Sequence, residues 1–402
     1  MGCLYPGQRG TVWIMKLDRS LLLLLGLGLV ARLLYAWLDL QTYASFDMES
    51  YQVVQGIVRH GGNVYAETSR YNYSPLWSWI LGVLDFFQRA TGLRAHLAIC
   101  GFLTGVDAAT CWLLARLAIA HGLSARHAVL AFWLNPISIL LTGLHGQFDN
   151  LAVLGLLACL WVQSTGKARG WAWACASAAV LVKQIVLFAP LYTLLRAFPG
   201  RISRLAVWAA CTLPFFLSLA PYWPGAAKGI TYHVLLYSSQ PELYGLTIFF
   251  PISRSRDPML LLHELRTVLF IALIGGSMLL PKRADALRAA LLAPLVFLAF
   301  TPGFAMQYLI LPVALGALRA GKAYLAYTAI ATVTLLGAYQ LIPGVWNVMW
   351  YVLAAVWASV LVWLGTEVRS IWQAHLAGRE DGDQRHALVD VDHAAGLERP
   401  AG

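Results

Sequence analysis

The segment LLLLLGLGLV at residues 21–30 decides the fold class, because it forms the centre of an apolar run long enough to cross a lipid bilayer. Similar runs recur along the whole chain of 402 residues, in which 59% of the residues are hydrophobic and only 12% are charged. A soluble domain needs more charge than this to cover its surface. The sequence therefore predicts an all-α, polytopic membrane protein.

The formal net charge of +10 does not indicate a nucleic-acid partner. The Lys and Arg residues form short clusters between the apolar runs, as in the cytoplasmic loops of membrane proteins. The six cysteines show neither metal-ligand spacing nor a paired pattern, so we expect them to pack as small apolar side chains. Short loops and the lack of a large soluble domain favour a bacterial inner membrane.

The apolar runs predict about twelve membrane spans. With the N-terminus inside, the connections rich in Lys and Arg fall on the cytoplasmic side, and this sets the expected orientation. The expected spans are 17–38, 96–118, 127–143, 147–163, 171–184, 185–197, 203–220, 262–280, 286–301, 305–318, 322–341 and 346–367.

Two apolar segments leave the topology open. Residues 75–88 are short, so we expect an interfacial or re-entrant helix on the outer side. Residues 171–197 are expected to divide into two spans at Lys183 and Gln184. In the rival topology the first segment is a span and the second is one long helix, which would place a basic loop outside.

We expect one transmembrane unit at residues 1–367, with large outer loops at 39–95 and 221–261. Residues 368–402 are polar and rich in Asp and Glu, which predicts a disordered cytoplasmic tail. We find no internal repeat in the sequence.

The first outer loop carries two acidic residues, Asp47 and Glu49, shortly after the first span. Tyr51, Val54 and Val58 are spaced for one face of a short helix that lies on the membrane, which would hold both carboxylates near the headgroups. The alternative is a solvated acidic helix start.

Further polar groups fall on the outer side. The stretch RYNYSPLW at residues 70–77 contains Tyr71 and Tyr73, although aromatic residues are common at the headgroup level. The turn HGQFDN at residues 145–150 holds more hydrogen-bonding side chains than a turn requires. A helix cap would explain Asp149 or Asn150 but leaves His145 and Gln147 unexplained.

Lys183 and Gln184 lie within an apolar segment, where a lysine must reach an anion or water, or extend to the interface. Gln307 lies at another outer helix junction, in TPGFAMQY at residues 301–308. His233 belongs to the second outer loop, where it is either a ligand-binding group or an ordinary surface residue.

In this order, the clusters resemble the GT-C superfamily of membrane glycosyltransferases. They look most like the dolichyl-phosphate-glucose-dependent glucosyltransferases of N-glycan assembly and the mannosyltransferase of GPI-anchor assembly. Asp47 stands where that fold keeps its essential acidic residue. The matching stretches, over residues 17 to about 200, are RYNYSPL (70–76), NPISILLTGLHGQFDN (135–150) and VKQ (182–184), which resemble the family's Tyr-x-Pro-Leu, His-Gly-x-Phe and Lys-Gln segments.

The sequence departs from the family pattern at two places. The acidic motif is Asp-Met-Glu-Ser-Tyr rather than Asp-x-Asp-Tyr, and Ser74-Pro75 stands where the glucosyltransferases have Pro-Pro. These departures leave open both the sugar, mannose or glucose, and the role of Glu49.

The resemblance implies inverting transfer of one hexose from a polyprenyl-phosphate carrier to an unidentified lipid, glycan or protein acceptor on the non-cytoplasmic side. Asp47 would be the general base, and Glu49 would orient hydroxyl groups. Lys183 would contact the donor phosphate or a sugar oxygen. The other expected substrate-binding residues are Tyr71, Tyr73, His145, Gln147, Asp149, Gln184, His233 and Gln307.

No cofactor is expected. A divalent metal between Asp47 and Glu49 is conceivable, but a donor with one phosphate needs less charge neutralisation than a diphosphate. The rival function is a transporter or flippase of a lipid-linked saccharide. Such proteins often show two related halves with sites near the bilayer midplane, whereas here the polar clusters lie at one face.

Overall fold

The structure is a computed structural model that describes residues 18–42, 46–166, 169–195, 197–198, 200–237, 243–282 and 284–396. Over these ranges the regular structure is entirely helical, which confirms the all-α prediction. The start of the first expected span and residues 238–242 of the second outer loop lie outside the described residues.

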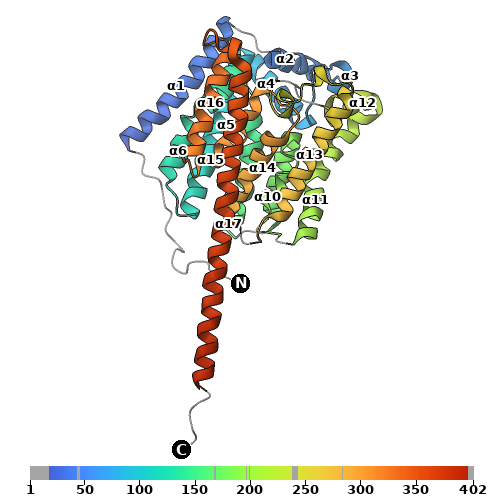
Figure 1. The fold of residues 1–402 in the computed structure, drawn as a ribbon. Coiled ribbons are helices and arrows are strands. Elements are labelled where there is room, and N and C mark those ends of the chain that lie inside the picture. Colours follow the sequence, from blue (N-terminus) through green and yellow to red (C-terminus); the bar gives the residue numbers. More distant parts are fainter. Residues whose placement is uncertain are drawn as a thin grey trace, which may run out of the picture.

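The helices form a bundle with several short segments at one end (Figure 1). The α-helices are α1 (Arg19–Thr42), α2 (Phe46–Arg59), α3 (Val64–Glu67), α4 (Pro75–Thr91), α5 (Ala95–Ala120), α6 (Ala125–Trp133), α7 (Pro136–Ile139), α8 (Asp149–Ser164), α9 (Arg169–Val182), α10 (Pro190–Thr193), α11 (Arg201–Leu219), α12 (Trp223–Gly229), α13 (Pro258–Leu279), α14 (Ala286–Phe300), α15 (Val313–Ala317), α16 (Lys322–Ala338) and α17 (Met349–Gly396). Two π-helices, η1 (Leu140–His145) and η4 (Ile230–Leu235), and the 3₁₀-helices η2 (Gln184–Val186), η3 (Ala220–Tyr222), η5 (Leu246–Ile248), η6 (Ile252–Arg254), η7 (Met306–Ile310) and η8 (Val345–Val348) interrupt them.

Five helices are long and apolar enough to cross a membrane, and the described residues contain up to six such spans if one bent pair is counted. The five are Arg19–Leu38, Ala95–Ala120, Arg201–Leu235, Pro258–Leu279 and Met349–Ala377, and the bent pair is Ala125–Trp133 with Pro136–His145. The expected count of twelve spans is therefore not confirmed. The other apolar helices have 10–17 residues, and at about 1.5 Å per residue they fall short of a hydrocarbon core of about 30 Å.

Breaks inside apolar runs explain the shorter helices. Helix α6 ends at Trp133, and Asn135 caps the start of α7, where its side-chain oxygen accepts from the Ile137 amide at 2.9 Å. The two helices meet at a bend of 48°. At Lys183 the backbone is extended, with φ −149° and ψ 117°, and α9 stops at Val182. The single long helix of the rival topology is thus absent, but neither piece of 171–197 has the length of a span.

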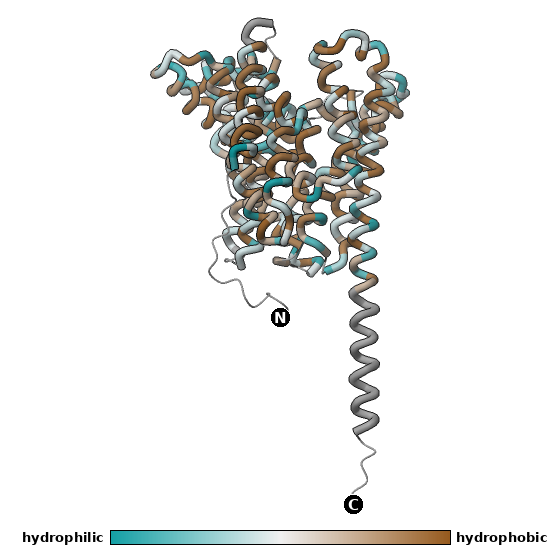
Figure 2. The backbone as a smooth tube through the Cα atoms, turned by 90° about the vertical axis from the view of Figure 1, so that its left-hand side faces the viewer, coloured by the Kyte–Doolittle hydropathy of each residue, from teal (hydrophilic) through white to brown (hydrophobic). Residues whose placement is uncertain are grey.

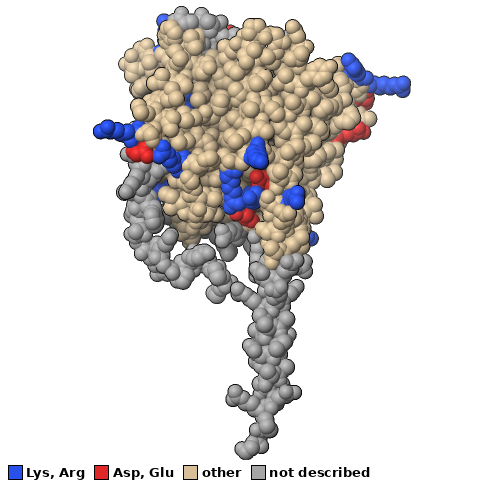
Figure 3. Space-filling view, turned by 60° about the vertical axis from the view of Figure 1, so that its left-hand side comes forward, with Lys and Arg blue, Asp and Glu red and all other residues tan. Residues whose placement is uncertain are grey.

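The outer surface of the bundle is apolar, as expected of a protein in lipid. Leu23 on α1 and Ile271 on α13 are 74% and 67% exposed. Brown segments in Figure 2 run along the length of the bundle, and the charged side chains on the face in Figure 3 form small groups separated by uncharged surface. These features are compatible with an integral membrane protein.

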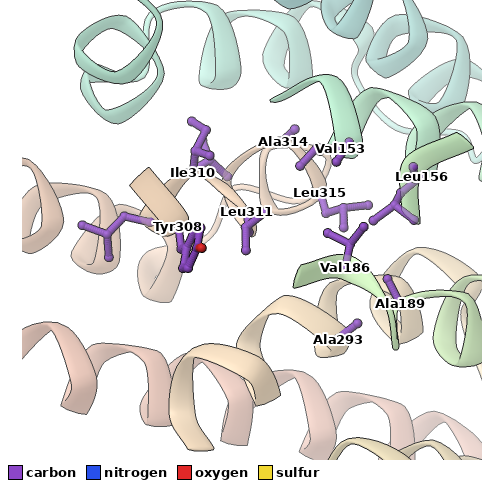
Figure 4. Packing of buried hydrophobic residues seen from close by; sticks show 14 of the residues in the cluster. Val153, Leu156, Val186, Ala189, Ala293, Tyr308, Ile310, Leu311, Ala314 and Leu315 are labelled. Carbon is purple, nitrogen blue, oxygen red and sulfur yellow. The ribbon is translucent and has the colours of Figure 1, made fainter. Parts of the chain in front are cut away.

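The hydrophobic core extends through most of the bundle, and one part of it lies between α8, α14 and the segment that follows the break at Lys183. Val153 and Leu156 of α8 face Val186, Ala189 of the next segment and Ala293 of α14 (Figure 4). Lys183, the residue just before η2, is itself buried.

A buried ion pair joins α1 to α5. Arg32 donates from Nε to Asp107 Oδ2 at 3.0 Å, and both side chains are fully buried. The hydroxyls of Ser138 and Thr142 donate to the same oxygen at 3.0 and 2.9 Å, and Asn150 Nδ2 donates to Asp107 Oδ1 at 2.6 Å. The Asp107 carboxylate therefore holds residues on both sides of His145, namely Ser138 and Thr142 before it and Asn150 after it.

Helices α2, α3 and α4 lie together at one end of the bundle (Figure 1). Arg59 of α2 and Arg89 of α4 both pair with Asp85 of α4. Ser74 caps α4 and donates to the carbonyl of Leu181, beside the break at Lys183. The interfacial position expected for residues 75–88 stays a prediction, as does the disorder of the tail, which α17 enters.

Candidate active site

The structure brings Asp47 of α2 against the turn that follows η1. His145 Nε2 lies 2.9 Å from Asp47 Oδ2, and Gln147 Nε2 donates to the same oxygen at 2.5 Å. Tyr51, one turn further along α2, donates to Gln147 Oε1 at 3.2 Å. Asp47 Oδ1 accepts no hydrogen bond from the described residues, and the side chain keeps 25% exposure. One oxygen is thus fixed and the other is open to a ligand.

The second ring nitrogen of His145 contacts a tyrosine from a distant helix end. Nδ1 lies 2.6 Å from the hydroxyl of Tyr339, which follows α16. An ionised carboxylate can only accept, so Nε2 of His145 donates to Asp47. The Tyr339 hydroxyl, which can donate or accept, holds the ring from its other side.

Competing influences act on the Asp47 carboxyl. Burial by itself would raise its pKa, but the hydrogen bond and charge of His145, the charge of Lys183 and the bond from Gln147 together lower the pKa below the ordinary value of 3.8. Asp47 is therefore ionised at neutral pH and can accept a proton.

The turn depends on a glycine. Gly146 ends η1 with φ +69°, a conformation that favours glycine, and a Cβ there would lie 2.5 Å from Cε of Met48. The next amide, that of Gln147, donates to Leu141 O at 2.9 Å. This close turn, at the end of a π-helix, lets both His145 and Gln147 reach one carboxylate.

Beside this cluster lies a fully buried lysine. Lys183 Nζ donates to Asp149 Oδ2 at 2.7 Å, and the two side chains are 1% and 0% exposed. The ammonium also lies over the rings of Phe148, Tyr73 and Tyr308, at 4.6, 5.0 and 5.2 Å from their centroids. Lys183 therefore does not extend to the interface, which was the alternative from the sequence.

Asp149 is not a helix cap. Phe148 occupies the N-cap position of α8 without a capping side-chain bond, while Asp149 is the partner of Lys183. Its Oδ1 is buried and has no hydrogen-bond partner. Such an unsatisfied oxygen is costly in the interior, and a donor group of a ligand would relieve it.

A cleft of about 450 Å³ opens from Lys183. The polar side chains that line it include Tyr73, Gln184, His263 and Arg266. Its apolar side chains include Ile185, Leu187, Phe188, Val234, Leu235, Leu236, Leu262, Leu269, Phe270, Leu273 and Phe297. The lining therefore combines two cations, Lys183 and Arg266, with an apolar surface that suits a hydrocarbon chain.

Several expected site residues lie elsewhere. Glu49 is half exposed and pairs with Arg70 at 3.4 Å, away from the carboxylate of Asp47. Tyr71 is buried, accepts from the Ser78 amide at 2.8 Å and donates to Ser74 O. His233 lines a separate hollow with Glu67.

The glutamines differ in position. Gln184 lines the cleft and donates to Asn72 O at 2.5 Å, while its buried Oε1 has no partner. Gln307 is buried next to Tyr308 in η7. Among the described residues no group of three or more His, Cys, Asp or Glu side chains is placed to hold a metal ion.

Sequence reasoning missed Tyr339 and Arg266. Arg266 is a charge within the apolar helix α13, two residues after Glu264, and a charge in such a helix is the signal that marks a functional or paired group. The same signal would have found Arg32 and Asp107. Tyr339 carried no comparable signal, because tyrosines at helix ends are common at the membrane interface.

Comparison with known proteins adds no relative: no protein-family model, no curated protein and no solved structure matches the chain.

Proposed function

We propose that this protein is a membrane glycosyltransferase that moves one hexose from a polyprenyl-phosphate carrier to an acceptor on the non-cytoplasmic side. The observation that carries the proposal is the ionised Asp47, which is held by His145 and Gln147 and is close enough to the buried Lys183 to feel its charge, while Lys183 lines a mostly apolar cleft. A lipid-linked anionic donor needs such a combination of cation and hydrocarbon surface.

The hydrocarbon chain and the phosphate of the donor fit different side chains of the cleft. Its hydrocarbon chain lies along the apolar side chains that α13 and the segment containing Phe188 contribute to the cleft. Its phosphate lies toward Lys183 and Arg266, the two cations that line the cleft. Cations near the leaving phosphate stabilise the charge that develops on it as the sugar departs.

The reaction is one displacement. The acceptor hydroxyl oxygen forms a bond to the anomeric carbon while the bond from that carbon to the phosphate oxygen breaks, and the phosphate leaves with the electron pair. Asp47 Oδ1 takes the hydroxyl proton. His145 is a positioning residue, since it fixes the other carboxylate oxygen. A single displacement inverts the anomeric centre.

The test is transfer from labelled donors. Membranes that contain the protein are incubated with polyprenyl-phosphate mannose or glucose, and labelled product is separated from donor. We expect one donor to be consumed, and Asp47→Asn to lower the rate at least about 100-fold. Glu264→Gln, an exposed carboxylate on α13 that does not line the cleft, is the matched control.

Two results would contradict the proposal. Full transfer by Asp47→Asn would remove the mechanism. Movement of an intact labelled donor lipid across the vesicle membrane, with no product formed, would instead favour the transporter or flippase.

A further inference from the structure

A second and larger cavity, of about 1170 Å³, lies at the other end of the bundle. It is formed by the start of α11, the end of α13, the start of α14 and residues 370–375 of α17. Helix α14 runs from this cavity to Thr301, which lines the cleft beside Lys183. Its 15 residues separate the two sites by about 22 Å, and the positive-inside rule places this cavity on the cytoplasmic side.

The lining of this cavity is strongly basic. Two of its arginines are neutralised, because Arg319 pairs with Asp285 at 2.6 Å and Arg288 pairs with Glu367 at 2.5 Å. Three further cations line the cavity without a carboxylate partner among the described residues, namely Arg201, Arg204 and Lys282. The cavity therefore carries an excess of positive charge.

Arg204 is the residue that points to a ligand. It is only 3% exposed, and one of its terminal nitrogens donates to Ser277 O at 2.6 Å. Its Nε is buried without a hydrogen-bond partner. A buried guanidinium with an unsatisfied N–H group is costly, and an anion in the cavity would supply the missing acceptor and the missing charge.

The rim of the cavity is apolar. Ile202 is 85% exposed and Leu279 is 69% exposed, and both line the cavity beside the basic groups. Each belongs to a helix long and apolar enough to cross a membrane. A ligand with an anionic head and hydrocarbon chains fits this arrangement better than a free phosphate, which would leave both side chains uncovered.

We propose that this cavity binds the phosphate headgroup of an anionic phospholipid from the cytoplasmic leaflet. Arg201, Arg204 and Lys282 hold the phosphate, and the acyl chains lie over Ile202 and Leu279. The site is independent of the proposed sugar transfer, because none of its residues lines the outer cleft.

The test measures binding to the purified full chain in a neutral detergent. Dioctanoyl phosphatidylglycerol is titrated while the unfolding temperature is followed, with dioctanoyl phosphatidylcholine as the zwitterionic lipid of equal chain length. We expect the anionic lipid alone to stabilise the protein. The double variant Arg201→Gln/Lys282→Gln should weaken its apparent affinity about tenfold or more.

The control is Arg19→Gln, which removes an exposed charge at the start of α1, a residue that does not line the cavity. Both substituted residues of the double variant are exposed, so its fold is retained, and the unfolding temperature without lipid checks this. Equal stabilisation by phosphatidylcholine, or wild-type affinity in the double variant, would overturn the proposal. Equal stabilisation by inorganic phosphate or glycerol phosphate at the same concentration would also overturn it, in favour of a soluble phosphate.

Discussion

The Nε2 atom of His145 lies 2.9 Å from Oδ2 of Asp47, although 98 residues separate the two in the sequence. The contact joins α2, the helix that follows the first span, to the end of η1. It leaves Asp47 Oδ1 as the oxygen available to an acceptor hydroxyl. The orientation and the charge of the proposed base therefore both depend on a neighbour that does not itself take the proton.

The first prediction concerns pH. In the wild type the bond and charge of His145 oppose the effect of burial and lower the pKa of Asp47 below 3.8. In His145→Gln that opposition is weakened, so burial raises the pKa and the base becomes protonated at a higher pH. The acid limb of kcat/KM should therefore lie below pH 3.8 in the wild type and above its wild-type position in the variant. Glu264→Gln should keep the wild-type limb, and an unmoved limb in His145→Gln would exclude Asp47 as the titrating base.

The second prediction separates chemistry from stability at Lys183. Removal of one member of a buried ion pair destabilises a protein by about 3–5 kcal/mol, so Lys183→Met should lower the unfolding temperature strongly. The double variant Lys183→Met/Asp149→Asn leaves no lone charge and should regain most of that stability. Its transfer rate should stay at least about 100-fold below the wild type, because the cation near the phosphate is still missing. Recovery of both properties would assign Lys183 a structural role only.

The third prediction concerns the pair that ties α1 to α5. Asp107→Leu leaves the buried guanidinium of Arg32 without its partner and should destabilise the protein by about 3–5 kcal/mol. The double variant Arg32→Met/Asp107→Leu should lose clearly less stability than Asp107→Leu alone, because it leaves no unpaired charge in the interior. Asp18→Asn, which breaks an exposed ion pair with Arg126, should change the stability little, because solvent screens exposed ion pairs. Thermal unfolding in detergent compares all three, and equal effects of the two single Asp substitutions would contradict the burial of Asp107.

The positions of the main site groups could be predicted from the sequence, because polar groups in or beside apolar runs must find partners. Asp47, His145, Asp149 and Lys183 all stood out for that reason. Their pairing could not be predicted. The sequence also allowed Asp47 to start a solvated helix, Asp149 to cap a helix and Lys183 to extend to the membrane interface. Only the packing of α8 against α9, beside the break at Lys183, brings Lys183 to Asp149.

The number of spans could not be predicted for a related reason. Hydrophobicity shows which residues avoid water, but it does not show where an apolar run stops being a helix. The break at Asn135 depends on its side-chain cap together with the following proline. The side-chain amide of Asn135 also donates to the Tyr324 hydroxyl at 2.8 Å, 189 residues away in the sequence. Such distant partners decide whether a polar residue interrupts a helix or lies along it.

The last prediction tests how closely α1 approaches the site segment. A Cβ at Gly143 in η1 would lie 2.7 Å from the backbone oxygen of Arg32 and 2.9 Å from its Cα. Backbone atoms cannot rotate away, so Gly143→Ala must push α1 and η1 apart, at an expected loss of about 1–3 kcal/mol. The displacement should also lower transfer, because His145 lies two residues further along η1. Gly105→Ala meets open space within α5 and should instead stabilise the protein by up to about 1 kcal/mol. Both variants are compared by thermal unfolding and by transfer rate, and wild-type values for Gly143→Ala would show that the two segments do not lie in contact.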